Sequence, residues 1–231
     1  MAELTPEVKP GTLVVFDIDN TLLEPVGNIG SDQWYYYLLK AYKRDGNLSD
    51  AEAEDRAAKA WTSTLGKVKV RPVEALTPPL VAALQRNGIQ VMALTARGTE
   101  DEGATMGQLK DIGVDLGANT VTTKRLAFKK GKLADAEQLF SGGVFFASEA
   151  ADKGKVLAAF MKKLKLKPSK VVFADDKPHH TKNVDAALTA AGIPVVALRY
   201  GAADAKVRAF NEVMAEADTP GSAELLFHGP K

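Results

Sequence analysis

Short, continuous apolar runs alternate along the chain with amphipathic segments. The runs are rich in β-branched and aromatic residues and lie at residues 13–16, 89–94, 143–147, 170–174 and 194–198. Runs of this kind are typical of strands that are buried on both faces. Helical patterns separate them, as in residues 152–168, where the apolar side chains share one face. The alternation predicts an α/β fold, with a Rossmann-like parallel sheet covered by helices on both faces.

One long interval interrupts this alternation. Residues 25–75 contain no run that suits a buried strand, and residues 31–46 and 48–66 have helical patterns that begin near a Ser or Asp cap. We therefore predict a small α-helical cap insertion at residues 25–75, within a core formed by residues 1–24 and 76–231. The aromatic residues 34–37 could form part of a substrate lid, although aromatic side chains of a helix often pack in a core instead. A shorter interruption at residues 120–138 predicts a hairpin that turns at residues 129–132.

The composition excludes several functional classes. The 30 basic and 29 acidic residues leave a net charge of +1, so no overall field attracts the chain to nucleic acid or to an anionic membrane. The absence of cysteine excludes disulfides, thiolate metal sites and a cysteine nucleophile. No apolar run is long enough to span a membrane, and the first residues lack the basic and apolar regions of a secretory signal. We expect a soluble protein without membrane insertion, cytoplasmic by default, or periplasmic or exported if a signal peptide has been removed.

Two acidic residues, Asp17 and Asp19, follow the first predicted strand directly. In an open parallel sheet, ligands bind outside the carboxyl ends of the strands. Two close carboxylates resist burial unless a cation or a shared proton stabilises them. Aspartate also forms turns readily, so this pair alone would be a moderate signal.

Three further groups of polar residues follow later predicted strands. They are Thr95, Ala96 and Arg97 after the second strand; Lys153 at a predicted helix start; and Asp175 with Asp176 after the fourth strand. A threonine hydroxyl and a guanidinium can both bind a phosphate. A lysine at a helix N-terminus costs about 0.3–1 kcal/mol against the helix dipole, and a bound anion would offset that cost. Each group alone could be a cap or an exposed charge, but their recurrence at successive strand ends predicts one common site.

This ordered set resembles the haloacid dehalogenase superfamily. Its four motifs are an Asp-x-Asp strand end, a Thr or Ser, a Lys or Arg, and an acidic pair. The resemblance covers residues 11–24 and 76–200. The DxDxT form at residues 17–21 is similar to the phosphatase branch, and helices inserted after the first motif are similar to the first cap position of that superfamily.

The resemblance implies a Mg²⁺-dependent phosphatase that hydrolyses a small phosphomonoester through an aspartyl-phosphate. Asp17 would be the nucleophile, and Asp19 would act first as general acid and then as general base. The implied Mg²⁺ ligands are Asp17, the backbone carbonyl of Asp19, and the acidic pair, with Asp176 favoured as the direct ligand and Asp175 as its support. The implied phosphate-binding residues are Thr95, Ala96, Arg97 and Lys153.

Several alternatives stay open at this point. A phosphomutase could use the same intermediate, and a catalytically silent binding module could keep the same fold. Lys155 competes with Lys153 as the phosphate-binding lysine. His179 and His180 follow the acidic pair and are either surface residues or contacts to the substrate or a loop. The identity of the substrate and the oligomeric state are not indicated by the sequence.

Overall fold

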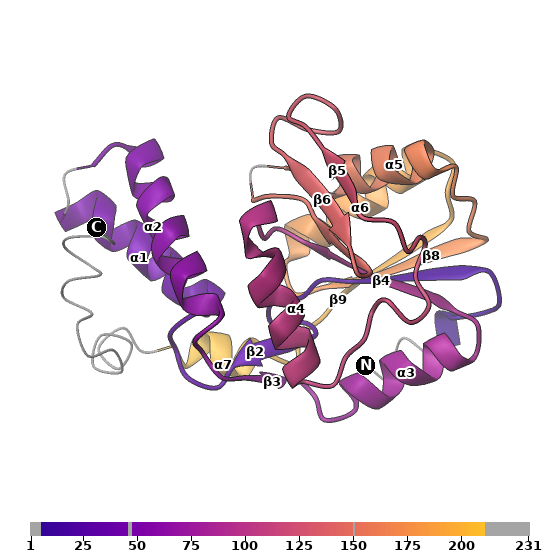
Figure 1. The fold of residues 1–231 in the computed structure, drawn as a ribbon, viewed down its shortest axis with the longest axis horizontal. Coiled ribbons are helices and arrows are strands. Elements are labelled where there is room, and N and C mark those ends of the chain that lie inside the picture. Colours follow the sequence, from indigo (N-terminus) through magenta and orange to yellow (C-terminus); the bar gives the residue numbers. More distant parts are fainter. Residues whose placement is uncertain (1–5, 46–47, 150, 211–231) are drawn as a thin grey trace.

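A seven-stranded sheet forms the centre of the protein, in the strand order β5-β6-β7-β4-β1-β8-β9 (Figure 1). The computed structural model describes residues 6–45, 48–149 and 151–210. The strands are β1 (Thr12–Phe16), β4 (Gln90–Thr95), β5 (Leu126–Phe128), β6 (Gln138–Ser141), β7 (Val144–Phe146), β8 (Lys170–Asp175) and β9 (Val195–Arg199). The five strands from β7 to β9 are parallel, as predicted. The other edge is antiparallel, because β5 and β6 form the hairpin predicted around residues 129–132.

Helices cover both faces of this sheet. They are α3 (Thr77–Arg86) and α4 (Glu102–Asp111) on one face, and α5 (Lys153–Leu164) and α6 (Pro178–Ala190) on the other. Successive residues of β1 point to opposite faces: Val14 and Phe16 join the core beneath α3 and α4, and Leu13 and Val15 join the core beneath α5 and α6. All four are at most 1% exposed, which explains why the strand has a continuous apolar run.

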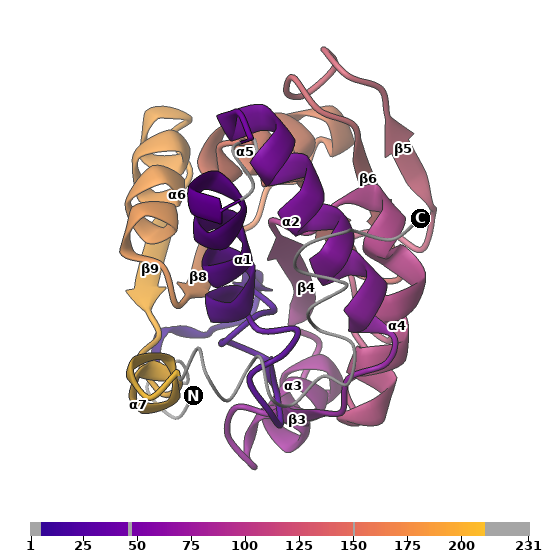
Figure 2. The same ribbon diagram turned by 90° about the vertical axis from the view of Figure 1, so that its left-hand side faces the viewer.

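A helical insertion, which consists of α1 (Asp32–Asp45) and α2 (Asp50–Leu65), leaves the core after β1. A two-stranded antiparallel ribbon of β2 (Leu23–Pro25) and β3 (Val70–Pro72) connects it to the core. Ser49 and Glu52 form a capping box at the start of α2, where the sequence predicted a Ser or Asp cap. Figure 2 shows α1 and α2 in front of the sheet, on the side of β4 and β8. The division into core and cap stays a prediction.

Two short helical segments complete the described chain. They are the 3₁₀ turn η2 (Thr99–Asp101), which leads into α4, and α7 (Asp204–Arg208), which follows β9. Within the described residues, every helix is too short or too polar to cross a lipid bilayer.

Close packing of α5 against α6 fixes the start of α5. A Cβ added at Gly154 would lie 2.1 Å from the backbone carbonyl oxygen of Asn183 in α6. Backbone cannot move aside as a flexible side chain can, so the position accepts only glycine without a shift of one helix. The preceding residue in α5 is Lys153, and its placement depends on this contact.

We expect Gly154→Ala to lower the free energy of unfolding by about 1–3 kcal/mol, because the added methyl group forces α5 away from α6. Gly107→Ala is the matched control, since Gly107 is exposed in α4 and an added Cβ would meet nothing within 4 Å. That variant should be more stable than the wild type by up to about 1 kcal/mol. Urea unfolding of both variants measures the difference, and equal midpoints would contradict this account of the α5–α6 contact.

Candidate active site

The polar strand ends meet where the strand order reverses. From β1 the chain goes to β4 on one side, and it later returns to β8 on the other side of β1. Because β1, β4 and β8 are parallel, their carboxyl ends lie at the same edge of the sheet. Asp17, Thr95 and Asp175 come from these three ends and are at most 5% exposed. The sequence-predicted groups are therefore brought together.

Lys153 lies between two carboxylates at this edge. Its Nζ is 2.6 Å from Oδ1 of Asp17 and 2.7 Å from Oδ2 of Asp175. Burial alone would lower the pKa of Lys153, but the two carboxylates raise it above its ordinary value. Burial also raises the pKa of Asp17, and the charge of Lys153 opposes that shift. Lys155 is exposed, and only its backbone amide contributes locally, by donating to the cap residue Asp152, so Lys153 is the lysine that enters the site.

A cluster of three buried acids offers oxygens for a hard cation. Ligand atoms of Asp17, Asp175 and Asp176 all lie within 4.8 Å of one another. Burial and then the nearby charge of Asp32 raise the pKa of Asp176 to about 7. Asn20 supports Asp176 by donating to its Oδ2 at 3.4 Å, and the Lys177 backbone amide donates to Asp175 at 2.8 Å. Repulsion among three close carboxylates falls when a divalent cation binds, so these residues fit Mg²⁺.

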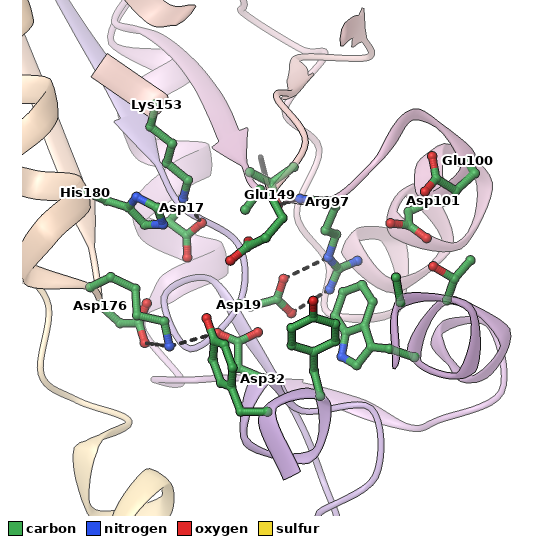
Figure 3. Close-up of a pocket in the computed structure, with 18 residues that line it drawn as sticks. Asp17, Asp19, Asp32, Arg97, Glu100, Asp101, Glu149, Lys153, Asp176 and His180 are labelled. Atoms are coloured by element: carbon green, nitrogen blue, oxygen red, sulfur yellow. Dashed lines mark hydrogen bonds and ion pairs between the residues drawn. The ribbon is translucent and has the colours of Figure 1, made fainter. Parts of the chain in front are cut away.

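Arg97 has a different partner from the one that the sequence suggested. Its Nε and Nη2 donate to the two carboxylate oxygens of Asp19 at 2.8 and 2.7 Å. Its Nη1 donates to Thr105 at 2.9 Å and to Gln108 at 2.8 Å, both in α4. The guanidinium is buried and holds Asp19 in a bidentate ion pair (Figure 3). A phosphate-binding role for Arg97 stays a prediction.

Thr95 and Ala96 lie beside Arg97 in the wall of the pocket. The Thr95 hydroxyl is buried, and its oxygen accepts a hydrogen bond from the Arg97 backbone amide at 3.1 Å. This bond shapes the turn that follows β4.

The helical insertion closes one side of the pocket. It contributes Asp32, Tyr35, Tyr36, Ala58, Trp61 and Thr62 to the lining. Lys177 reaches from the core to Asp32 at 3.0 Å and also lies 3.3 Å from Asp176. The ring of Trp61 lies 5.4 Å from the Arg97 guanidinium, and Gln108 donates to the Leu65 carbonyl oxygen at 2.7 Å. Together, insertion and core enclose a cavity of ≈ 110 Å³.

Several residues that line the pocket were not predicted from the sequence. They are Asp32, Trp61, Glu100, Asp101, Glu149 and Lys177. Lys177 directly follows the acidic pair, which was a usable signal, and Ala58, Trp61 and Thr62 share one face of α2 at helical spacing. Among the aromatic residues considered for a lid, Tyr35 and Tyr36 line the pocket, whereas Trp34 and Tyr37 are buried in the core of the insertion.

Residues 1–221 match the family described as "Protein of unknown function (DUF2608)". The chain belongs to this family. A curated Chlamydia pneumoniae protein described as "Putative outer membrane protein" is 21% identical to the DUF2608 chain over 213 residues, which are 92% of this chain and 78% of that protein.

Two solved structures are similar to the DUF2608 chain. A haloacid dehalogenase-like family hydrolase from Streptococcus pneumoniae matches with a TM-score of 0.50 and 14% identity, over 80% of this chain and 83% of that one. A Thermotoga maritima structure titled "putative beta-phosphoglucomutase" matches with a TM-score of 0.43 and 13% identity, over 85% and 91% of the chains. The first match gives the DUF2608 chain a haloacid dehalogenase-like fold, and at this identity the likeness concerns the fold alone.

The two histidines differ in their surroundings. His180 lines the pocket, and its Nδ1 is buried without a hydrogen-bond partner among the described residues, whereas His179 is exposed. Burial lowers the pKa of His180 to about 3, and the positive charge of Lys153 acts in the same direction. The native protein therefore keeps His180 neutral at a pH where the unfolded chain binds a proton.

Above pH 6.5, His180 is neutral in both the folded and the unfolded protein. We expect the free energy of unfolding to decrease as the pH falls from 6.5 toward 3, because only the unfolded chain then binds the proton. Between pH 6.5 and 5, wild type should lose about 1–2 kcal/mol relative to His180→Gln. Subtracting the pH profile of His180→Gln from that of the wild type removes the contribution of the carboxylates, which both proteins share. Urea unfolding at several pH values measures this difference, and parallel profiles would contradict the lowered pKa.

Proposed function

We propose that this protein is a Mg²⁺-dependent phosphatase that hydrolyses small phosphomonoesters through an aspartyl-phosphate on Asp17. The observation that carries this proposal is the buried cluster of Asp17, Asp175 and Asp176 around Lys153, beside a cavity between core and insertion. Nucleophile, metal ligands and a cation for the phosphoryl group lie together there. Phosphoryl transfer depends mainly on such positioning and on charge stabilisation.

Asp17, Asp175 and Asp176 would hold the metal. When bound, Mg²⁺ neutralises charge on the phosphate and on the carboxylates that surround it. The chain supplies the remaining positive charge through Lys153, which is kept protonated by its two carboxylate partners.

In the first step, a carboxylate oxygen of Asp17 attacks phosphorus and the bond to the leaving alcohol oxygen breaks. Lys153 contacts Oδ1 of Asp17, so the second oxygen of this carboxylate can face the phosphorus. In the second step, water attacks the phosphorus of the aspartyl-phosphate, the bond to Asp17 breaks, and inorganic phosphate leaves. Asp19 would donate a proton to the alcohol and later take one from the water. The bidentate ion pair with Arg97 holds the Asp19 carboxylate in place for both proton transfers.

Hydrolysis is better supported than a mutase reaction. A mutase has to keep a bisphosphorylated intermediate and turn it within a closed site. The cavity of ≈ 110 Å³ is partly open to solvent, so water can reach an aspartyl-phosphate formed in it. This access favours hydrolysis over transfer of the phosphoryl group within a closed site.

We expect the wild type to release phosphate from 4-nitrophenyl phosphate in the presence of Mg²⁺, and Asp17→Asn to lose at least about 10³-fold in kcat/KM. The matched control is Asp185→Asn, because Asp185 is an exposed residue of α6. Circular dichroism of each variant verifies folding. Full activity of folded Asp17→Asn would contradict the aspartyl-phosphate, and inactivity of the wild type on a broad phosphomonoester panel would contradict the phosphatase assignment.

Mg²⁺ should stabilise the folded protein even without a substrate, since the three acids converge only in the native state. At a Mg²⁺ concentration 100 times the Kd, the gain is about 2.7 kcal/mol, which thermal unfolding detects as a rise in Tm. The rise should be lost in Asp176→Asn and kept in Asp185→Asn. A rise of equal size in both variants would place the metal elsewhere.

A further inference from the structure

The cavity beyond the phosphate-binding cluster has an acidic and aromatic lining. Seven carboxylates line the cavity: Asp17, Asp19, Asp32, Glu100, Asp101, Glu149 and Asp176. Three basic side chains accompany them: Arg97, Lys153 and Lys177. A bound Mg²⁺ and a phosphate dianion would cancel each other's charge. An excess of negative charge therefore remains for the leaving alcohol to meet.

Each of the three basic side chains already has a carboxylate partner. Lys153 contacts Asp17 and Asp175, Lys177 contacts Asp32 and Asp176, and Arg97 contacts Asp19. In the part of the chain that the structure describes, none of these bases forms an ion pair with Glu100, Asp101 or Glu149. The unpaired acids all lie on the core side of the cavity.

Asp101 is the most deeply buried of the unpaired acids. It is 2% exposed, and its Oδ2 accepts from the Gly98 backbone amide at 3.0 Å. The side chain of Thr62 in α2 also hydrogen-bonds this carboxylate. A buried carboxylate without a paired cation is costly, and a positive charge in the cavity would reduce that cost.

Glu149 is an exposed residue of the loop after β7 and lines the same space. Figure 3 shows its carboxylate pointing into the cavity, above Asp19 and Asp32. Burial and then the charge of Asp32 raise the pKa of Glu149, so these two acids repel each other within the pocket. A cation placed between them would remove this repulsion.

Aromatic rings form the opposite wall of the cavity. Tyr35 and Tyr36 pack edge to face, with ring centroids 5.3 Å apart. Lys177 lies over Tyr36, and Arg97 lies over Trp61, so both rings already face protein cations. Among the pocket aromatics that the structure describes, Tyr35 is the ring without such a partner. Aromatic faces attract ammonium groups, including quaternary ones.

We propose that the cavity selects phosphomonoesters of small amino alcohols, with the ammonium group held between Glu149, Asp32 and Tyr35. The proposal rests on the phosphatase function and names its substrate class. The cavity of ≈ 110 Å³ suits a small alcohol that carries the charged nitrogen. A second phosphate or a carboxylate on the alcohol would be repelled by the unpaired acids, so such esters are poor substrates.

The test compares two esters of the same shape. Phosphocholine carries a quaternary ammonium group, and 3,3-dimethylbutyl phosphate has a neutral carbon in place of the nitrogen. We expect kcat/KM to be about 10-fold or more higher for phosphocholine, in line with a cation–π contact and a carboxylate contact that act together. Phosphoglycolate, whose alcohol carries a carboxylate, should be hydrolysed more slowly than the neutral ester. The proposal would be overturned if kcat/KM for the neutral ester or for phosphoglycolate equalled or exceeded that for phosphocholine.

Glu149→Gln tests the role of the acid directly. The variant should reduce the phosphocholine preference several-fold, because it removes charge but keeps shape. Glu137→Gln is the matched control, since Glu137 is exposed and does not line the cavity, and it should keep the wild-type preference. An unchanged preference in Glu149→Gln would overturn the proposed position of the ammonium group.

Binding separates this proposal from the phosphatase assignment. Calorimetry with 2-(trimethylammonio)ethylphosphonate and 3,3-dimethylbutylphosphonate, in the presence of Mg²⁺, needs no turnover. We expect the charged phosphonate to bind wild type about 10-fold more tightly, and this difference to shrink in Glu149→Gln. That result without hydrolysis of any ester would support the ammonium site while refuting the phosphatase function. Hydrolysis of the esters without tighter binding of the charged phosphonate would support the phosphatase function while refuting the ammonium site. Failure of both phosphonates to bind would also refute the ammonium site.

Discussion

A buried ammonium group between two carboxylates holds the centre of this molecule together. Lys153 is 1% exposed and contacts Asp17 from β1 and Asp175 from β8. Removing such a charge from water is costly unless its partners lie at hydrogen-bonding distance, so the three groups have to stay in place together. The contact fixes the start of α5 against the ends of two central strands. Gly154 makes this possible by letting α5 approach the backbone of α6.

Neighbouring charged residues at the same strand ends position the helical insertion. Lys177 connects Asp32 of α1 with Asp176, and Arg97 connects Asp19 with α4 while lying over Trp61 of α2. Each link joins a strand-end acid to the insertion. Changes of charge at the strand ends, such as the arrival of a metal or a phosphate, are therefore felt by the residues that hold the insertion. The pocket and the buried acids form one electrostatic unit.

The sequence predicted the fold well because each of its signals is local. Continuous apolar runs identified the strands, and acids placed directly behind them identified the site edge. Lys153 was recognisable because a lysine is unfavourable at a helix N-terminus. The ribbon of β2 and β3 was missed, since each strand has three residues and ends in proline. Trp61 reaches the pocket only through the angle at which the insertion docks, and no local pattern encodes that angle. Glu149 lies in the loop after β7, and no sequence pattern predicts the path of that loop.

The sequence could not predict that Arg97 pairs with Asp19, because a guanidinium group binds a carboxylate as well as a phosphate. The structure limits what this residue can still do. A guanidinium has five N–H donors, and four of those in Arg97 serve Asp19, Thr105 and Gln108. A bidentate contact with phosphate would require Arg97 to release Asp19, while α4 and Trp61 restrain its movement. Orienting Asp19 is the role that these contacts favour, and in the proposed phosphatase Lys153 would then be the main side-chain cation for the phosphoryl oxygens.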